Sequence, residues 1–309
     1  MCLKLFNMAA PYSIFRPNLF KNKVAIVTGG GTGIGKGITE ELLHLGCKVV
    51  VASRNEERLR KAAEDMRNRL VVAQPHTGAD LLAIPCNIRK ENEVKNLMES
   101  TLEKFHKIDF LVNNGGGQYI SHVEDISTKG WQAVIDTNLT GAFLMCREAF
   151  HSGMKENGGS IVNIIADMVK GMLFMGHSGA ARAGVENMTK TMAIEWAKYG
   201  IRINCVLPGS AIYSESAAMN YGDPALFERL KPEIPARRLG TVQEVSAAVC
   251  FLLSPGASFV SGATLNVDSG GSLYSRNFFE IPDHDRWPAP LEGQTEDDGG
   301  QGSTPPSKL

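Results

Sequence analysis

Short apolar runs rich in valine and isoleucine alternate along the chain with longer segments whose apolar residues are spaced three and four apart. The short runs have the length of β-strands and fall at residues 23–28, 48–52, 81–84, 110–113, 160–165, 202–206 and 264–267. One longer segment carries Val94, Leu97, Met98, Leu102 and Phe105, a spacing that gives a helix one apolar face. Because nearly continuous apolar strands need cover on both faces, the alternation predicts a single-domain, doubly wound α/β fold with a seven-stranded parallel sheet.

The strand and helix pattern extends over residues 21–287, which we interpret as one domain. Residues 1–20 precede it as an N-terminal extension, in which Met8 competes with Met1 as the initiating residue. Residues 288–309 are rich in glycine, proline and acidic residues and have little apolar surface to bury. We therefore expect them to form a flexible tail.

The last three residues are Ser307, Lys308 and Leu309. A C-terminal S-K-L tripeptide is an address read by a peroxisomal import receptor. Its position at the end of the predicted tail makes it accessible, so the sequence predicts import into peroxisomes through this receptor.

The overall charge and composition narrow the class of protein. The chain has 32 lysines and arginines against 33 aspartates and glutamates, a formal net charge of −1. It therefore lacks the positive field that drives nucleic-acid binding, and it lacks the ~18 consecutive apolar residues that span a bilayer. The cysteines are spread singly without metal-ligand spacing, which predicts packed, reduced thiols and no metal site; they are Cys2, Cys47, Cys86, Cys146, Cys205 and Cys250.

A glycine-rich loop lies between the first predicted strand and the helix that follows it. Residues without Cβ atoms let backbone N–H groups and the helix N-terminus approach a pyrophosphate. Because a strand precedes the loop and a helix follows it, the sequence predicts a Rossmann-type dinucleotide site. Its candidate residues are Gly29, Thr32, Gly33, Ile34 and Gly35.

The end of the second predicted strand indicates which dinucleotide binds. An NAD site usually has a carboxylate there, which accepts from the ribose 2′-hydroxyl. This chain has Ser53 and Arg54 instead, and a hydroxyl beside a guanidinium suits a 2′-phosphate. We therefore expect NADP(H) as the cofactor.

Several motifs in the same order resemble those of the short-chain dehydrogenases/reductases. They are T-G-x-x-x-G-x-G at residues 28–35, N-N-G-G at residues 113–116 in place of N-N-A-G, a helix asparagine at Asn138, a P-G turn at residues 208–209 and V-D-S-G-G at residues 267–271. The similarity covers about residues 21–274. It implies a Rossmann-type reductase domain that forms homodimers or homotetramers.

The resemblance also implies cofactor contacts beyond the glycine loop. Asn87 and Ile88 would flank the adenine, and Asn114 and Gly115 would line the nicotinamide side. The P-G turn, Pro208 and Gly209, would hold the carboxamide. All are assigned by the position of the motif in this sequence.

The chain departs from the family at the catalytic residues. Other members reduce carbonyls with a serine and a Y-x-x-x-K pair, whose tyrosine gives a proton to the developing alkoxide. Alignment on residues 183–184 places Ser178 at the tyrosine and Arg182 at the lysine, and Ala166 falls near the serine. Asn138 remains. A guanidinium can bind the cofactor ribose but does not relay protons, and a serine is too weak an acid to replace tyrosine.

These replacements favour reduction of a C=C bond over reduction of a carbonyl. In a conjugated acyl-CoA thioester the negative charge collects on the thioester oxygen, where hydrogen-bond donors suffice. Ser178, or a ribose hydroxyl held by Arg182, could supply them. The segments NNGGGQ and HSGAARAGV resemble members that reduce trans-2-enoyl-CoA with NADPH in peroxisomes. A 2,4-dienoyl-CoA reductase, a carbonyl reductase with another acid and a non-enzymatic NADP(H)-binding protein remain alternatives.

Other residues are candidates for the substrate and the proton. Asp167, Tyr119, Tyr213 and His177 are candidate proton donors. The phosphates of CoA could be bound by Lys231, Arg237 and Arg238, and an acyl chain could contact Met172, Leu173, Phe174, Met175 and Met219. For each of these residues, a loop or surface role is the simpler alternative.

Overall fold

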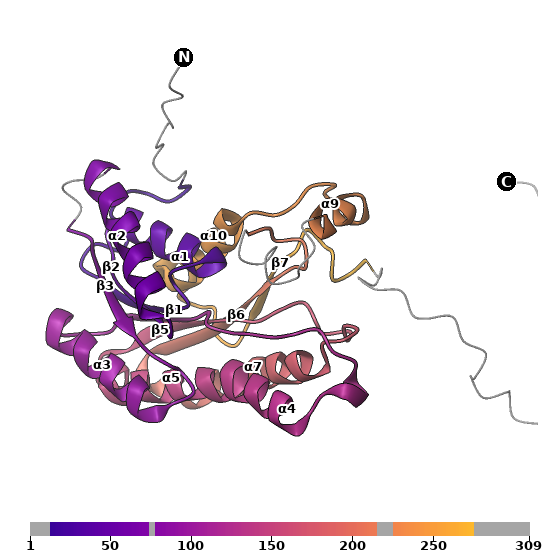
Figure 1. Cartoon of the computed structure of the whole chain (residues 1–309). Coiled ribbons are helices and arrows are strands. Elements are labelled where there is room, and N and C mark those ends of the chain that lie inside the picture. Colours follow the sequence, from indigo (N-terminus) through magenta and orange to yellow (C-terminus); the bar gives the residue numbers. More distant parts are fainter. Residues whose placement is uncertain (1–12, 74–77, 215–224, 275–309) are drawn as a thin grey trace, which may run out of the picture. The chain divides into compact units, whose positions relative to one another are not determined.

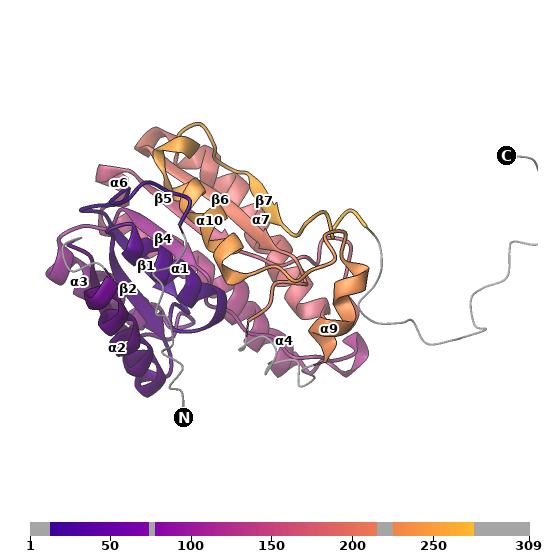
Figure 2. The same cartoon turned by 90° about the horizontal axis from the view of Figure 1, so that it is seen from above.

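Seven parallel strands form one sheet in the computed structural model, as the alternation predicts. The structure describes residues 13–73, 78–214 and 225–274, all within one compact unit. The strand order is β3-β2-β1-β4-β5-β6-β7 (Figures 1 and 2). The strands are β1 (Val24–Thr28), β2 (Lys48–Ser53), β3 (Asp80–Pro85), β4 (Phe110–Asn113), β5 (Gly159–Ile164), β6 (Ile201–Pro208) and β7 (Thr264–Val267).

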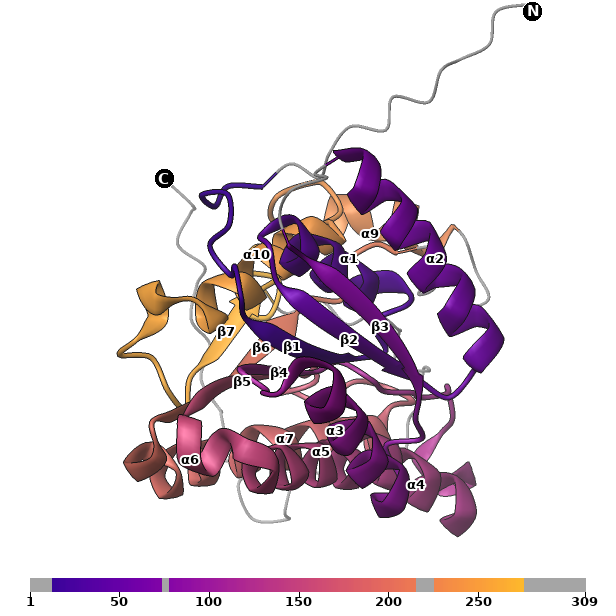
Figure 3. The same cartoon turned by 90° about the vertical axis from the view of Figure 1, so that its left-hand side faces the viewer.

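Helices cover both faces of this sheet, so the doubly wound fold is confirmed (Figure 3). On one face lie α1 (Gly33–His44), α2 (Glu56–Ala73) and α10 (Val242–Leu253), and on the other lie α3 (Glu91–Phe105), α5 (Gly141–Ala149) and α7 (Gly176–Glu195). The shorter helices are α4 (Thr128–Ile135), α6 (Lys155–Asn157) and α9 (Leu226–Leu230).

The pleat of β1 shows how the sequence fills the two layers. Ala25 and Val27 pack in the core that contains α1, α2 and α10, while Val24 and Ile26 pack in the core of α3, α5 and α7. All four side chains are buried, because alternate residues of a strand point to opposite faces. This two-sided burial explains the unbroken apolar run in the sequence.

The strand order reverses beside β1, which has β2 on one side and β4 on the other. The chain first builds the sheet outward to β3 and then crosses back to β4. At such a reversal the loops after two neighbouring strands diverge, and ligands bind outside the carboxyl ends of the strands. The loops after β1 and β4 contain the predicted cofactor residues.

The helical segment from α4 to α5 contains a widened turn. Residues Asp136–Thr140 form a π-helical turn, η2, with helical backbone at both ends. Asn138 lies in this turn and is only 1% exposed. Single π-turns inside α-helices are frequent at functional sites, and this one carries the asparagine that matches the family motif.

The cysteines of the described residues are Cys47, Cys86, Cys146, Cys205 and Cys250, and all are free and buried. Burial raises the pKa of each thiol, to about 11 for Cys205. Among these same described residues, no group of three His, Cys, Asp or Glu side chains could hold a metal. No helix in the described ranges is long and apolar enough to cross a membrane. Cys2 lies outside the described residues.

Candidate active site

The glycine loop connects β1 to α1 and has room for backbone but not for side chains. Gly29 and Gly33 have φ of +66° and +51°, which L-residues rarely adopt. A Cβ on Gly35 would overlap the carbonyl oxygen of Gly29 and the amide of Asn114. This cradle leaves the first N–H groups of α1 accessible and therefore fits a pyrophosphate. Thr32 is the exposed N-cap residue and Ile34 is half-buried.

A buried threonine closes the loop onto the helix. The Thr39 hydroxyl lies 3.1 Å from the carbonyl oxygen of Gly30 and 2.9 Å from that of Gly35. Sequence analysis missed this residue, although its position one turn after Gly35 was visible. Since the side chain is fully buried, it ties the loop to α1 and rigidifies the cradle.

Positive charge gathers where β2 ends. Ser53 is half-buried and Arg54 is exposed. The side chain of Asn55 caps α2 by accepting from the N–H of Arg58, at 2.8 Å. In the same helix Ala62 lies beside the glycine loop, since a Cβ on Gly31 would be 3.5 Å from it. Arg58 lies one turn before Ala62 and thus on the same side of α2.

Arg58 is therefore a second candidate for the cofactor phosphate, and sequence analysis missed it. Arg60 pairs with Glu56 at 2.6 Å. Within the described part of the chain neither Arg54 nor Arg58 pairs with a carboxylate. The signal was the spacing of four between Arg58 and Ala62, which only the contact of α2 with the loop makes meaningful.

The residues expected around adenine and nicotinamide lie next to the glycine loop. Thr28 Oγ1 accepts from the backbone N–H of Asn114 at 3.0 Å and from that of Gly115 at 2.8 Å. The Asn114 side chain donates to the Thr28 carbonyl at 3.0 Å. Ile88 lies against Gly115, and the N–H of Asn87 donates to Glu93 at 2.8 Å. The structure thus brings together the loops after β1, β3 and β4.

The P-G turn lies at the end of β6, beside the segment that follows β7. The N–H of Gly209, which follows Pro208, donates to the carbonyl of Val267 at 3.0 Å. A Cβ on Gly209 would lie 2.6 Å from the Cβ of Asp268, so this position requires glycine. The carboxylate of Asp268 accepts from the N–H groups of Gly270 and Ser272, which fixes its orientation.

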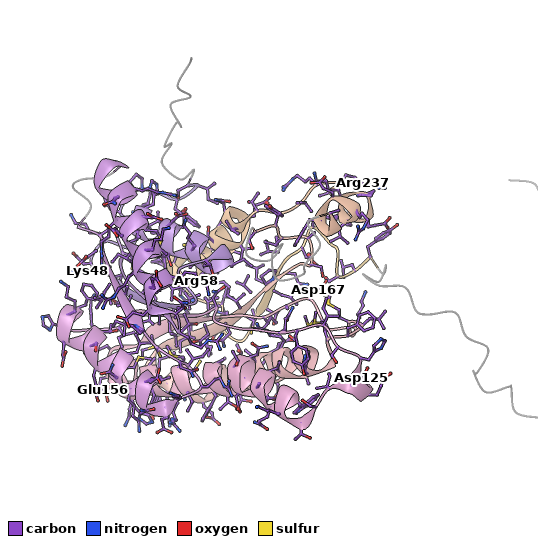
Figure 4. All side chains as sticks on the ribbon, in the orientation of Figure 1. Lys48, Arg58, Asp125, Glu156, Asp167 and Arg237 are labelled. Atoms are coloured by element: carbon purple, nitrogen blue, oxygen red, sulfur yellow. The ribbon has the colours of Figure 1, made fainter. Side chains whose placement is uncertain are left out.

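Asp167 follows β5 on the same side of the sheet. Figure 4 shows it on the side where α4 and α9 lie, opposite Lys48 and Glu156, which precede the sheet's other edge. Burial and the nearby negative charge of Asp268 raise the pKa of Asp167. It is the candidate proton donor whose acidity is best placed for proton exchange.

The three residues at the family's catalytic positions converge on one short segment, residues 116–118. The Asn138 side chain accepts from the N–H of Gly117 and donates to its carbonyl, both at 2.9 Å. The Ser178 hydroxyl donates to Oε1 of Gln118 at 2.7 Å. A Cβ on Gly116 would lie 2.5 Å from Nη2 of Arg182.

Arg182 is held inside the protein by a backbone carbonyl. Its Nη1 donates to the Ile164 carbonyl at 2.7 Å, and its buried Nε has no partner among the described residues. Burial lowers the pKa of Arg182 to about 10, so the guanidinium stays charged at neutral pH. A charged side chain with an unused donor at the lysine position fits the ribose of a dinucleotide.

The remaining candidate proton donors are held by packing. Burial lowers the pKa of His177, and its ring packs edge-on against Tyr119 with centroids 4.5 Å apart. A neutral imidazole has no proton to donate as an acid. The Tyr213 ring packs edge-on against Phe227.

The expected substrate contacts are partly occupied within the chain. Lys231 pairs with Glu228, and Arg238 pairs with Glu244. Arg237 donates to the Pro232 carbonyl. Of the apolar candidates, Met175 is buried, Met172, Leu173 and Phe174 are half-buried, and Met219 lies outside the described residues.

A parallel sheet with a glycine cradle at its first βα turn, and charged donors at its carboxyl edge, defines a dinucleotide-dependent oxidoreductase. A family model described as "Enoyl-(Acyl carrier protein) reductase" matches residues 29–272. The chain belongs to this family, within the short-chain dehydrogenases/reductases.

Similar proteins agree with this assignment. Peroxisomal 2,4-dienoyl-CoA reductases [(3E)-enoyl-CoA-producing] are 34% identical in Danio rerio, over 86% of this chain and 87% of that one, and 36% identical in Rattus norvegicus, over 84% and 87%. A citronellol catabolism dehydrogenase from Pseudomonas aeruginosa has 45% identity and a TM-score of 0.73, covering 84% and 99%. An actinorhodin polyketide ketoreductase variant with NADPH has 31% identity and a TM-score of 0.75, covering 84% and 100%.

Proposed function

We propose that the chain reduces a conjugated acyl-CoA thioester with NADPH. The observation that carries this proposal is the replacement of the tyrosine and lysine positions by Ser178 and Arg182, beside an intact cofactor cradle. Neither side chain can protonate an alkoxide at neutral pH. Both can support a site that only has to stabilise an oxyanion.

The chemistry requires two electrons and one proton. NADPH supplies the hydride. In a trans-2-enoyl thioester the hydride is added at C3, the C2=C3 electron pair moves toward the thioester oxygen, and C2 then takes a proton. In a 2,4-dienoyl thioester the hydride is added at C5, C2 again takes the proton, and a C3=C4 double bond remains. Both reactions place the developing charge on the same oxygen, so the same donors stabilise it.

NADP(H) is the cofactor of this family member. The residues of the site support the choice, because Arg54 and Arg58 offer two guanidinium groups and the end of β2 offers no carboxylate. Arg182 would orient the nicotinamide ribose through its guanidinium. The cradle between Gly29 and Gly35 would hold the pyrophosphate.

The substrate is an unsaturated acyl-CoA, and two candidates remain. The curated relatives favour the 2,4-dienoyl thioester, since their printed names state this substrate and a (3E)-enoyl product. The segments NNGGGQ and HSGAARAGV favour the trans-2-enoyl thioester, through the resemblance described above. The candidates differ in whether the nicotinamide must lie near C3 or near C5 when the thioester oxygen is bound.

Product analysis decides between them. Purified protein is given NADPH with a medium-chain trans-2-enoyl-CoA, the matching 2,4-dienoyl-CoA or a 3-ketoacyl-CoA, and the products are identified by mass spectrometry. We expect oxidation of NADPH with at least one of the first two, yielding saturated acyl-CoA or 3-enoyl-CoA, and none with the third. Tight NADPH binding without turnover of any thioester would favour the non-enzymatic alternative.

Peroxisomal import and self-assembly complete the proposal. The relatives' names place them in peroxisomes, and the Ser307-Lys308-Leu309 terminus agrees, although it lies outside the described residues. Deleting these three residues should leave a tagged chain in the cytosol. We also propose a homodimer or homotetramer, and a monomeric mass at micromolar concentration would refute it.

A further inference from the structure

Segment 116–118 is contacted by all three residues at the family's catalytic positions, and this arrangement asks what the segment itself does. Asn138 makes two hydrogen bonds with Gly117. Arg182 lies against Gly116. Ser178 binds the side chain of Gln118. Residues that act on substrate in other members are here directed at one loop.

Ser178 cannot itself reach a substrate. Its side chain is fully buried, and a hydroxyl has one proton to donate. That proton is donated to Oε1 of Gln118, at 2.7 Å. The consequence is a fixed orientation of the glutamine amide, because the atom facing Ser178 must be the acceptor. The NH₂ group of Gln118 therefore faces away from Ser178.

Gln118 is exposed, whereas the atoms that hold it are not. Asn138 is 1% exposed and fixes the backbone one residue before Gln118. The Tyr119 ring, one residue after it, packs against the buried His177 with centroids 4.5 Å apart. A donor whose surroundings are fixed before the reaction stabilises charge with little reorganisation. The amide of Gln118 meets this requirement.

The position of Gln118 in the chain places it near the reacting atoms. Asn114 and Gly115, expected at the nicotinamide, are fixed to Thr28 at the end of β1. Gln118 follows Gly115 by three residues on the same loop, at the carboxyl edge of the sheet. Its amide group is thus on the side where a substrate must meet the nicotinamide.

We infer that Gln118 is a catalytic residue, whose side-chain N–H donates a hydrogen bond to the thioester oxygen while negative charge builds there. Ser178 and Asn138 are positioning residues that orient this donor. The inference rests on the proposed function and names the donor that acts in it.

Two substitutions test the role. Gln118→Glu keeps an acceptor for Ser178 but replaces the N–H donor with negative charge, and Gln118→Met removes both. Loss of one oxyanion donor lowers kcat by ~10²–10³-fold, so we expect at least ~100-fold for each variant, with the Kd for NADPH and the Tm unchanged. The activity of Gln118→Glu relative to wild type should rise as pH falls, because a protonated carboxyl can donate. Gln118→Met should show no such rise.

Gln243→Glu is the matched control. Gln243 is an exposed residue of α10, so the same chemical change should leave kcat unchanged. If wild type reduces a thioester and both Gln118 variants keep kcat within ~3-fold, Gln118 is not the donor and the proposed function stands. Loss of NADPH affinity in parallel with kcat would assign Gln118 a structural role instead. If wild type reduces no thioester, the proposed function fails and this inference fails with it.

Discussion

Replacing Arg182 with methionine separates what this guanidinium does for folding from what it does for the cofactor. The side chain lies in the core of the site, where Nη1 donates to the buried Ile164 carbonyl at 2.7 Å. Methionine has a similar length, no charge and no donor. It fills the space and removes the hydrogen bond.

Two opposing terms set the effect on stability. Burial lowers the pKa of Arg182 to about 10, and at ~1.36 kcal/mol per pKa unit the buried charge costs roughly 3 kcal/mol. Because the folded pKa lies below the unfolded one, this cost is present at every pH below about 10. The charged hydrogen bond to Ile164 contributes ~1.5–3 kcal/mol in the opposite direction. The free energy of unfolding should therefore change by less than ~2 kcal/mol.

Cofactor binding has no such compensation. If Arg182 holds the nicotinamide ribose, its loss removes ~1.5–3 kcal/mol of charged hydrogen bonding, and the Kd for NADPH should rise ~10–100-fold. Calorimetry of NADPH binding and a thermal melt of the same sample measure the two effects. An unchanged Kd, or a melt that shows gross destabilisation, would refute this reasoning.

Arg202→Met is the control for removing a buried arginine elsewhere. Arg202 lies on β6 and donates to four backbone carbonyls, those of Leu252, Leu253, Ser254 and Val260. All four lose a charged donor, so we expect a larger fall in Tm than for Arg182→Met. The Kd for NADPH should not change.

Three further changes test other parts of the structure. Gly35→Ala places a Cβ against the Gly29 carbonyl and should weaken NADPH binding by at least ~10-fold, as measured by fluorescence titration; wild-type affinity would disprove the tight cradle. The raised pKa of Asp167 means that its ionised form is penalised above that pKa and the penalty is absent at low pH. Asp167→Asn should therefore raise Tm at pH 7 and do so less near about pH 4, whereas an equal gain at both would contradict the burial argument. Thr241→Ala removes the capping box formed with Glu244 at the start of α10 and should cost ~1 kcal/mol in a urea melt; an unchanged midpoint would show that the cap contributes nothing.

Local patterns predicted the sheet and the cofactor cradle because both depend on neighbouring residues. The strand ends differ from the prediction by two residues at most, as where β6 continues to Pro208. Proline is accepted there because it ends the strand. The conformations of Gly29 and Gly33 follow directly from the motif that suggested them.

The contacts of the catalytic positions could not be predicted in this way. Ser178 and Gln118 are 60 residues apart, and only the adjacency of β4 and β5 brings their loops together. Arg238 was expected to bind a substrate phosphate, yet the chain folds back so that it pairs with Glu244 and lowers the pKa of that carboxyl to about 2. A partner chosen by the path of a loop is not visible in the sequence of either residue.

The buried thiols have a consequence for how the folded molecule withstands oxidation. Peroxide reacts with thiolate rather than thiol, and burial keeps Cys47, Cys86, Cys146, Cys205 and Cys250 protonated and out of reach. In a compartment that generates hydrogen peroxide, such as the peroxisome proposed above, these sulfurs would be attacked only in chains that have opened. Oxidation at these five positions would therefore accumulate at the rate of unfolding, and the mass of each chain would record whether it has ever lost its fold.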